Sequence, residues 1–321
     1  MPLSYEATKL LIGYLDVHPR FQLALNCPSL RTTEKLIPLK IDRLDLTGPS
    51  CISVNGHDIE LQKLKPHLLQ LTISSPRGKD IMRFKCSMDL ESAMKQLISL
   101  LFSNRRDLSV NCLHVCPNLL TPTVKFQVRN LNLAKSCYDI RELDSNIDQN
   151  SPPLDVLGIH CHPRNFRNWE HPTVRNAKKL IFHYPYYDAA FSNIYQGAHR
   201  HIHLSLTDNA KGVWHVLNGV INEWRRNWRE IGDVFSFYIK TEFFIQLMKK
   251  FDSILSRVGG ERIDLWTMVV PLNDAIQIQI RFEGVIHYDG IDEDADYLLH
   301  LPHVYMRAEG YIVLRVVPVD E

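Results

Sequence analysis

Cysteine and histidine alternate in one segment, CLHVC at 112–116. On a β-strand Cys112, His114 and Cys116 would project from one face, and thiolate and imidazole are ligands of zinc. A structural zinc site needs four ligands, commonly with Cys-x-x-Cys or His-x3-His spacing, which is missing here. His160-Cys161-His162 could donate further groups, but strands two repeats apart are separated by about 10 Å, too wide for one tetrahedral ion. We therefore expect no metal centre from these residues.

A second histidine series occupies every other position, at His199, His201 and His203. Three histidines can form a metal-ligand set. The simpler interpretation is a strand whose Ile202 and Leu204 face the core, so that His201 and His203 lie on the opposite face or in solvent. We favour that interpretation.

Two further segments resemble known sites only in part. The acidic run from Asp292 to Asp296 begins like a calcium loop, but Tyr297 replaces the required glycine and His303 the final glutamate, so a solvated loop is expected. The segment WRRNWR at 224–229 interleaves tryptophan with cations, as some nucleic-acid and membrane binders do. On a helix, Trp224 and Trp228 would instead turn toward the core while the arginines face water.

Composition argues against several function classes. The 321 residues carry 37 Lys and Arg against 36 Asp and Glu, so no net field favours nucleic acid or an anionic membrane. The chain lacks a Gly-x-Ser-x-Gly elbow, a phosphate loop, a dinucleotide fingerprint and a His-Glu-x-x-His motif. We expect no catalytic residue and no cofactor, with a hydrolase of unrecognised site as a weak alternative.

The cysteines and the amino terminus favour an intracellular protein, cytoplasmic or nuclear. Seven cysteines, an odd number confined to Cys27–Cys161, do not suggest a disulfide framework. The first residues lack the basic and apolar regions of a secretory signal. No apolar run approaches the length of a membrane span.

Nine short apolar tetrads, most of them alternating, recur through the first 265 residues. Successive tetrads begin between 18 and 42 residues apart, and a period of about 20 to 29 is typical of leucine-rich repeats. We therefore predict an α/β fold in which residues 39–270 form an irregular leucine-rich-repeat-like solenoid with a mainly parallel sheet. The apolar pairs are Leu44/Leu46, Leu71/Ile73, Leu113/Val115, Leu131/Leu133, Leu157/Ile159, Leu180/Phe182, Ile202/Leu204, Phe235/Phe237 and Ile263/Leu265.

The two ends of the chain depart from this rhythm. Residues 1–38 predict three short helices, because an apolar stripe runs from Ala7 to Leu15 and prolines stand at helix-starting positions. Residues 271–321 contain two strictly alternating segments, 276–282 and 311–317, which predict an antiparallel strand pair that caps the solenoid.

The head carries a resemblance to a known family. The opening Pro2-Leu3, the leucine stripe, Arg20-Phe21 and CPSL at 27–30 resemble the head of a nematode family of uncharacterised F-box-like proteins, and more distantly an F-box. The order Pro-Leu replaces the usual Leu-Pro, and no tryptophan follows Cys27. Later segments are similar to the same family, so the likeness covers most of the chain. They are LESAMKQLISLLF (90–102), HPTVRNAKKLIF (171–182) and VWHVLNGVINEWRRNWREIGDVFSF (213–237).

The resemblance implies a non-enzymatic substrate-recognition adaptor of a Skp-cullin-F-box ubiquitin ligase. Residues 1–38 would bind the Skp-type adaptor, and the repeat body would hold an unknown client protein. The alternative is a protein-binding scaffold solenoid without a ligase connection, whose head only caps the first strand. The residues expected to bind the partner are Pro2, Leu3, Leu10, Leu11, Leu15, Phe21, Leu23 and Leu30.

Overall fold

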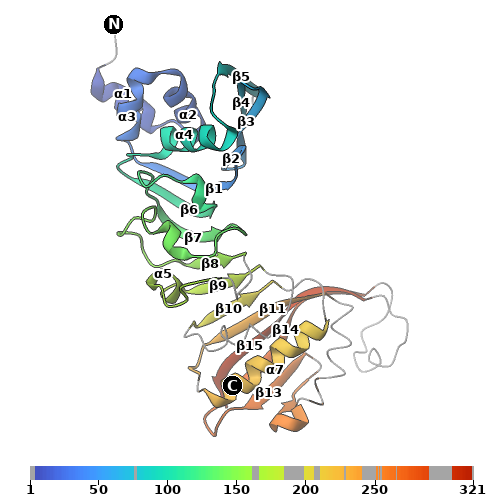
Figure 1. Cartoon of the computed structure of the whole chain (residues 1–321). Coiled ribbons are helices and arrows are strands. Elements are labelled where there is room, and N and C mark those ends of the chain that lie inside the picture. The colour runs from blue at the N-terminus through green and yellow to red at the C-terminus, as the bar shows by residue number, and fades with distance from the viewer. Residues whose placement is uncertain are drawn as a thin grey trace. The chain divides into compact units, whose positions relative to one another are not determined.

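The chain is a mixed α/β protein that divides into two compact units (Figure 1). Unit 1 comprises Met1–His160 and Phe166–Ala177, and unit 2 comprises Cys161–Asn165 and Lys178–Glu321. The division falls inside the range 39–270, so the predicted head belongs to unit 1 and the predicted C-terminal strands to unit 2. The computed structural model describes all residues except 1–3, 76–77, 161–165, 184–198, 206–209, 228, 241–250, 252, 254, 265, 289–305 and 320–321.

Three helices open unit 1 where the sequence predicts them. They are α1 (Tyr5–Gly13), α2 (Val17–Asn26) and α3 (Pro28–Lys35). Ser4 caps α1, because its side-chain oxygen accepts a hydrogen bond from the backbone N–H of Ala7 at 3.2 Å. Pro28 stands at the start of α3, where its missing N–H costs nothing.

Four parallel strands carry the leucine ladder of unit 1. Leu44 pairs with Leu113, Leu113 with Leu131 and Leu131 with Leu157, and all four side chains are buried. The prediction that these tetrads lie on neighbouring parallel strands is confirmed. Short 3-10 turns at Pro117–Leu119 and Ile140–Leu143, rather than long helices, connect the last three strands. The strands are β1 (Leu39–Gly48), β6 (Leu108–Val115), β7 (Gln127–Leu133) and β8 (Val156–Ile159).

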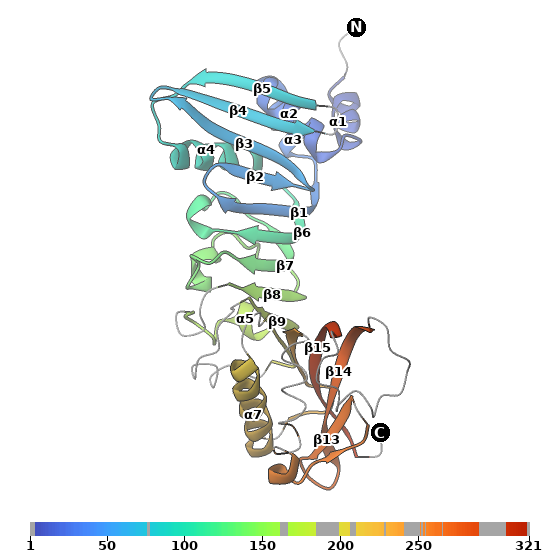
Figure 2. The same cartoon turned by 90° about the vertical axis from the view of Figure 1, so that its right-hand side faces the viewer.

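An antiparallel meander extends the sheet from the other side of β1 (Figure 2). Its strands are β2 (Cys51–Val54), β3 (His57–Lys65), β4 (Leu68–Ser75) and β5 (Gly78–Lys85). Asn55 and Gly56 form the turn between β2 and β3, with φ of 52° and 82°, as a two-residue hairpin requires. The interpretation of Leu71/Ile73 as a parallel repeat is therefore wrong, because this pair lies on antiparallel β4.

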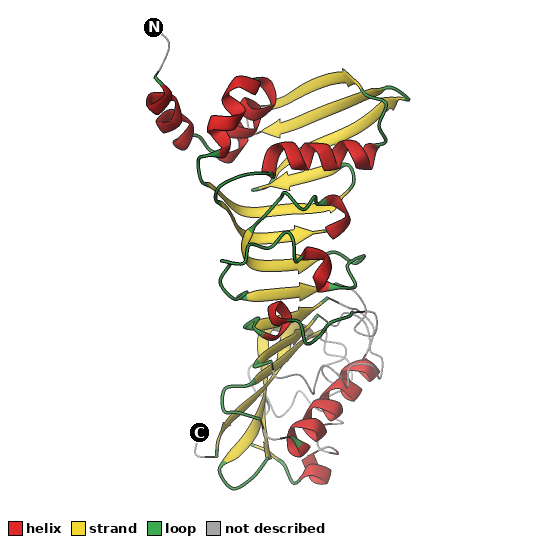
Figure 3. Ribbon diagram, turned by 60° about the vertical axis from the view of Figure 1, so that its left-hand side comes forward, coloured by secondary structure: helices red, strands yellow, loops and turns green. Residues whose placement is uncertain are grey.

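Helix α4 (Leu90–Phe102) follows the meander and lies along the strands of unit 1 (Figure 3). Asp89 caps it by accepting a hydrogen bond from the N–H of Ser92 at 2.9 Å. The long interval between Leu71 and Leu113 thus contains both a strand and a helix. At its end Phe102 meets Phe21 edge to face, with ring centroids 5.4 Å apart, which joins the head to the main core.

Unit 2 repeats the arrangement of a parallel run continued by antiparallel strands. The parallel strands are β9 (Lys179–Phe182), β10 (His201–Leu204) and β11 (Val234–Lys240). The predicted C-terminal pair is confirmed: β14 (Ile276–Tyr288) and β15 (Met306–Pro318) pair antiparallel, and β15 joins them to β11. Strands β13 (Thr267–Pro271) and β12 (Glu261–Arg262) complete the sheet, beside helix α7 (Ala210–Arg226).

The last predicted tetrad, around Ile263 and Leu265, is not a strand at the position after β12 that the structure describes. Ile263 follows β12 and is exposed, and Leu265 lies outside the described residues. The repeat pattern ends at β11, after which the sheet continues with antiparallel strands.

Candidate functional site

Helix α1 turns its apolar stripe to solvent. Its one buried residue is Ile12, which lies on a different side of the helix from the stripe. A helix of a folded unit usually buries its apolar stripe, whereas this face is left uncovered by the residues that the structure describes. We call it the α1 stripe; its members are Leu10, Leu11, Tyr14 and Leu15, which are 62%, 50%, 82% and 39% exposed.

The other predicted partner residues lie elsewhere. Phe21 is only 1% exposed and packs on Phe102, so it belongs to the core and is removed from the candidate surface. Phe21 differs from the leucines of the head because the side of α2 that carries it faces Phe102 of α4. Leu23 and Leu30 are half-buried. Pro2-Leu3 lie outside the described residues.

A buried ionic network fixes the head to the rest of unit 1. The carboxylate of Glu34 in α3 accepts hydrogen bonds from Arg20 of α2 at 2.9 Å and from Arg105, after α4, at 2.7 Å and 2.9 Å. Arg20 also donates to the carbonyl oxygens of Ile37 and Pro38. Burial lowers the pKa of Arg20, and Glu34 opposes that shift. Helices α2 and α3 are therefore held in place while the α1 stripe stays uncovered.

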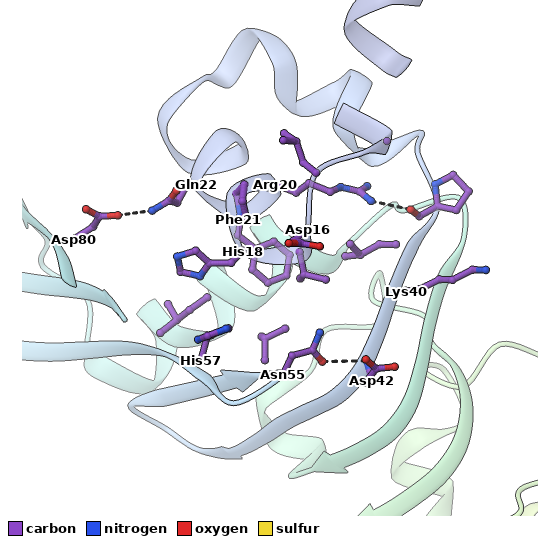
Figure 4. Close-up of a pocket in the computed structure, with 18 of the residues that line it drawn as sticks. Asp16, His18, Arg20, Phe21, Gln22, Lys40, Asp42, Asn55, His57 and Asp80 are labelled. Carbon is purple, nitrogen blue, oxygen red and sulfur yellow. Dashed lines mark hydrogen bonds between the residues drawn. The ribbon is translucent and has the colours of Figure 1, made fainter. Parts of the chain in front are cut away.

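A polar cavity of about 1000 Å³ lies beside α2 (Figure 4). It is bounded by α2, the start of β1, the β2–β3 turn and the first residues of β5. The rings of His18 and His57 approach to 5.6 Å between centroids, and the amide of Gln22 donates to Asp80. Burial and then His57 lower the pKa of His18, while Asp80 opposes them. The lining contains both cationic and acidic side chains, so the cavity has no marked preference for a ligand of one charge.

Polar side chains on one face of the parallel strands form a polar ladder, which consists of Asp45 of β1, His114 of β6 and Asn132 of β7. His114 Nδ1 lies 3.2 Å from Asp45 Oδ2, and its ring stacks on that of His160 with centroids 5.2 Å apart. The rings are closer than the about 10 Å expected from the strand spacing, because the two side chains extend toward each other. Asn132 donates to the sulfur of Cys112 at 3.6 Å. Among the described residues no group of three or more potential ligands is placed to hold a metal ion.

In unit 2 the histidines follow the expected alternation. His201 and His203 are half-buried between Ile202 and Leu204, which are buried, as predicted for a strand with one core face. His203 Nδ1 lies 2.9 Å from the hydroxyl of Ser236. Burial, and next the positive charge of Lys179, lower the pKa of both imidazoles to about 4.

Residues Trp224–Arg226 of the tryptophan-rich segment form the end of helix α7. Trp224 is buried and Arg225 and Arg226 are exposed, as predicted. Arg229 departs from the prediction, because its guanidinium lies over the Trp224 ring at 5.8 Å and burial lowers its pKa. Trp228 and the acidic run 292–296 lie outside the described residues.

Comparison with known proteins matches part of the chain to a family model. The sequence model of a family described as a domain of unknown function (DUF3557) matches residues 89–241. The matched region begins at the cap of α4 and ends just after β11, so α1 to α3 and the β2–β5 meander lie outside it. No curated protein and no solved structure matches the chain. Within the described residues, no helix combines the length and apolarity needed to span a membrane.

Proposed function

We propose that this protein is a non-enzymatic substrate-recognition adaptor of a Skp-cullin-F-box type ubiquitin ligase. In this proposal α1 to α3 are an F-box-like head that binds the Skp-type adaptor, and the body is a leucine-rich-repeat-like solenoid that holds a client protein. The observation that carries the proposal is the α1 stripe, whose four large side chains are exposed to solvent. The resemblance of the head to F-box-like proteins supplies the identity of the partner.

The energetics favour a partner on this face. Burying one leucine side chain is worth about 1.5 to 3 kcal/mol, so leaving several exposed on one helix face forgoes much of the available stabilisation. The stability of unit 1 does not account for the exposed stripe, because Ile12 is the one residue of the nine-residue helix α1 that is buried. A protein partner that covers Leu10, Leu11 and Tyr14 would recover that free energy as affinity.

The parallel strands offer a surface for a client. The polar ladder of Asp45, His114 and Asn132 runs across three neighbouring strands with partly exposed side chains. Asp45 and His114 are held by their mutual contact and Asn132 by its hydrogen bond to Cys112, so these groups lose little conformational entropy on binding. This surface supports a role in recognition rather than in catalysis.

A second function is favoured by a different observation. Helices α2 and α3 do bury Phe21, Ala24 and Glu34 within unit 1, as a plain cap for the first strand would. A scaffold solenoid without a ligase connection would need only this contact. The two functions differ in what they require of α1, because only the adaptor needs its stripe.

The test is co-purification of the full chain with a Skp-type adaptor. We expect wild-type protein to retain the adaptor and Leu11→Asp to lose it, because the substitution places an unpaired charge in the contact. Leu64→Asp is the matched control, since Leu64 is an exposed leucine on β3, away from α1, and it should retain the adaptor. If wild-type protein fails to bind, or if both variants bind equally well, the head acts only as a cap.

A further inference from the structure

Strand β5 is the last strand of the unit 1 sheet and pairs along its whole length with β4 alone among the described strands. Seven of its eight residues are exposed. An edge strand of this kind offers backbone donors and acceptors to an additional strand. We propose that the outer edge of β5 binds an extended acidic peptide segment, which adds to the sheet as a further strand.

The positive charge of β5 favours an acidic peptide over a basic one. Lys79, Arg83 and Lys85 are exposed on the strand, whereas its single acidic residue, Asp80, accepts a hydrogen bond from Gln22 of α2. Arg83 is held in place, because its Nε donates to the side-chain oxygen of Gln70 on β4 at 3.0 Å. A bound strand that carries carboxylates on matching positions would gain charge-assisted contacts with Arg83 and Lys85.

The apolar residues of β5 specify the rest of the segment. Ile81 and Phe84 are 53% and 40% exposed and lie on opposite faces of the strand. An added strand in which carboxylates alternate with apolar side chains would place the carboxylates on the face of Arg83 and Lys85 and the apolar side chains on the opposite face, against Phe84. The same positive charges would repel a second copy of β5, which disfavours edge-to-edge pairing of two identical chains.

The inference deepens the proposed adaptor function and rests on it only in naming the source of the peptide as a client protein. The binding site itself lies on the meander, and its test does not use the Skp-type adaptor. A variant that loses the peptide should keep the adaptor, so the two proposals can fail independently.

Fluorescence anisotropy with the full chain tests the inference. The probe is a labelled peptide as long as β5 in which glutamate alternates with valine. A second peptide has lysine in place of each glutamate, and a third keeps glutamate but has four consecutive central amides N-methylated, which removes strand pairing without changing charge. The protein variant is Arg83→Glu/Lys85→Glu. Its control is Lys125→Glu/Lys135→Glu, which reverses two exposed lysines outside the meander.

We expect wild-type protein and the Lys125→Glu/Lys135→Glu control to bind the glutamate peptide. The Arg83→Glu/Lys85→Glu variant should bind it about tenfold or more weakly, and the lysine and N-methylated peptides should show a similar loss. Absence of binding to the glutamate peptide would overturn the inference. Equal binding of the N-methylated peptide, or equal loss in both variants, would show attraction of charge without strand addition and would also overturn it. Self-association that Arg83→Glu/Lys85→Glu changes would assign the edge to a second copy.

Discussion

The carboxylate of Glu34 binds the guanidinium of Arg105 at 2.7 Å, although the two residues are 71 positions apart in the chain. Both side chains are buried, and Arg20 completes the network from α2. The head is therefore built into unit 1 by a specific ionic contact, rather than tethered to it by the chain. Because α2 and α3 are held this way, α1 can present its stripe in a defined orientation.

Glu34→Gln should strongly destabilise unit 1. The substitution leaves two buried guanidinium groups without their counter-charge, and breaking a buried ion pair from one side costs about 3 to 5 kcal/mol. Chemical denaturation followed by circular dichroism measures the change.

The same chain provides a matched control in Glu91→Gln. Glu91 pairs with Lys95 at 2.9 Å on the exposed face of α4, and such surface pairs contribute about 0.3 to 0.5 kcal/mol. Equal denaturation midpoints for Glu34→Gln and Glu91→Gln would show that the buried network does not hold the head.

Phe21→Ala and Leu10→Ala should have opposite consequences. Phe21 lies in the core against Phe102, so its truncation should cost about 3 to 5 kcal/mol of unfolding free energy. Leu10 is largely exposed, so its truncation should leave stability almost unchanged and weaken adaptor binding instead. Thermal unfolding and adaptor affinity, measured on both variants, separate the two roles. A large loss of stability in Leu10→Ala would mean that the α1 stripe is covered within the chain.

Unit 2 should lose stability as the pH falls from 6.5 toward 4. The folded-state pKa values of His201 and His203 are lowered from 6.5 to about 4, by burial first and by Lys179 next. Between these pH values the imidazoles are protonated in the unfolded state but stay neutral in the folded state. The free energy of unfolding therefore decreases as the pH is lowered from 6.5 to 4, and the contribution of the two histidines is fully present above pH 6.5. With allowance for solvent screening, the effect is on the order of 1 kcal/mol.

Urea unfolding at pH 7 and pH 5, followed by tryptophan fluorescence, measures this effect, because four of the five tryptophans belong to unit 2. A His201→Gln/His203→Gln variant isolates the contribution of the pair from that of other groups. We expect the midpoint of the variant to depend less on pH than that of the wild type. Identical pH dependence would contradict the assignment.

The sequence predicted the parts of the fold that are set by local pattern. Leu113, Leu131 and Leu157 recur at a repeat spacing, and their burial in one ladder follows from it. The alternation of Ile276 to Phe282 predicted β14 because one face of that strand packs in the core. Such patterns predict strands because a strand with one buried face needs apolar residues at every second position of the sequence.

The meander and the site depended on features that the pattern does not reveal. Asn55-Gly56 was an available hairpin signal, and its recognition would have placed β2 and β3. Strand β5 gives no periodic signal because it is exposed on both faces. Phe21 and Leu10 are both apolar, and only tertiary packing puts one in the core and the other in solvent. The approach of Glu34 to Arg105 is likewise a long-range contact.

Hydrogen–deuterium exchange of the full chain with and without a Skp-type adaptor tests the central claim most directly. The account predicts that the amides of α1, Tyr5–Gly13, gain protection when the adaptor is added, because docking on the α1 stripe suppresses opening of this short helix. Strand β5 should show no change, because its edge is assigned to a different partner. Unchanged exchange in Tyr5–Gly13 at adaptor concentrations in the micromolar range would contradict the adaptor function.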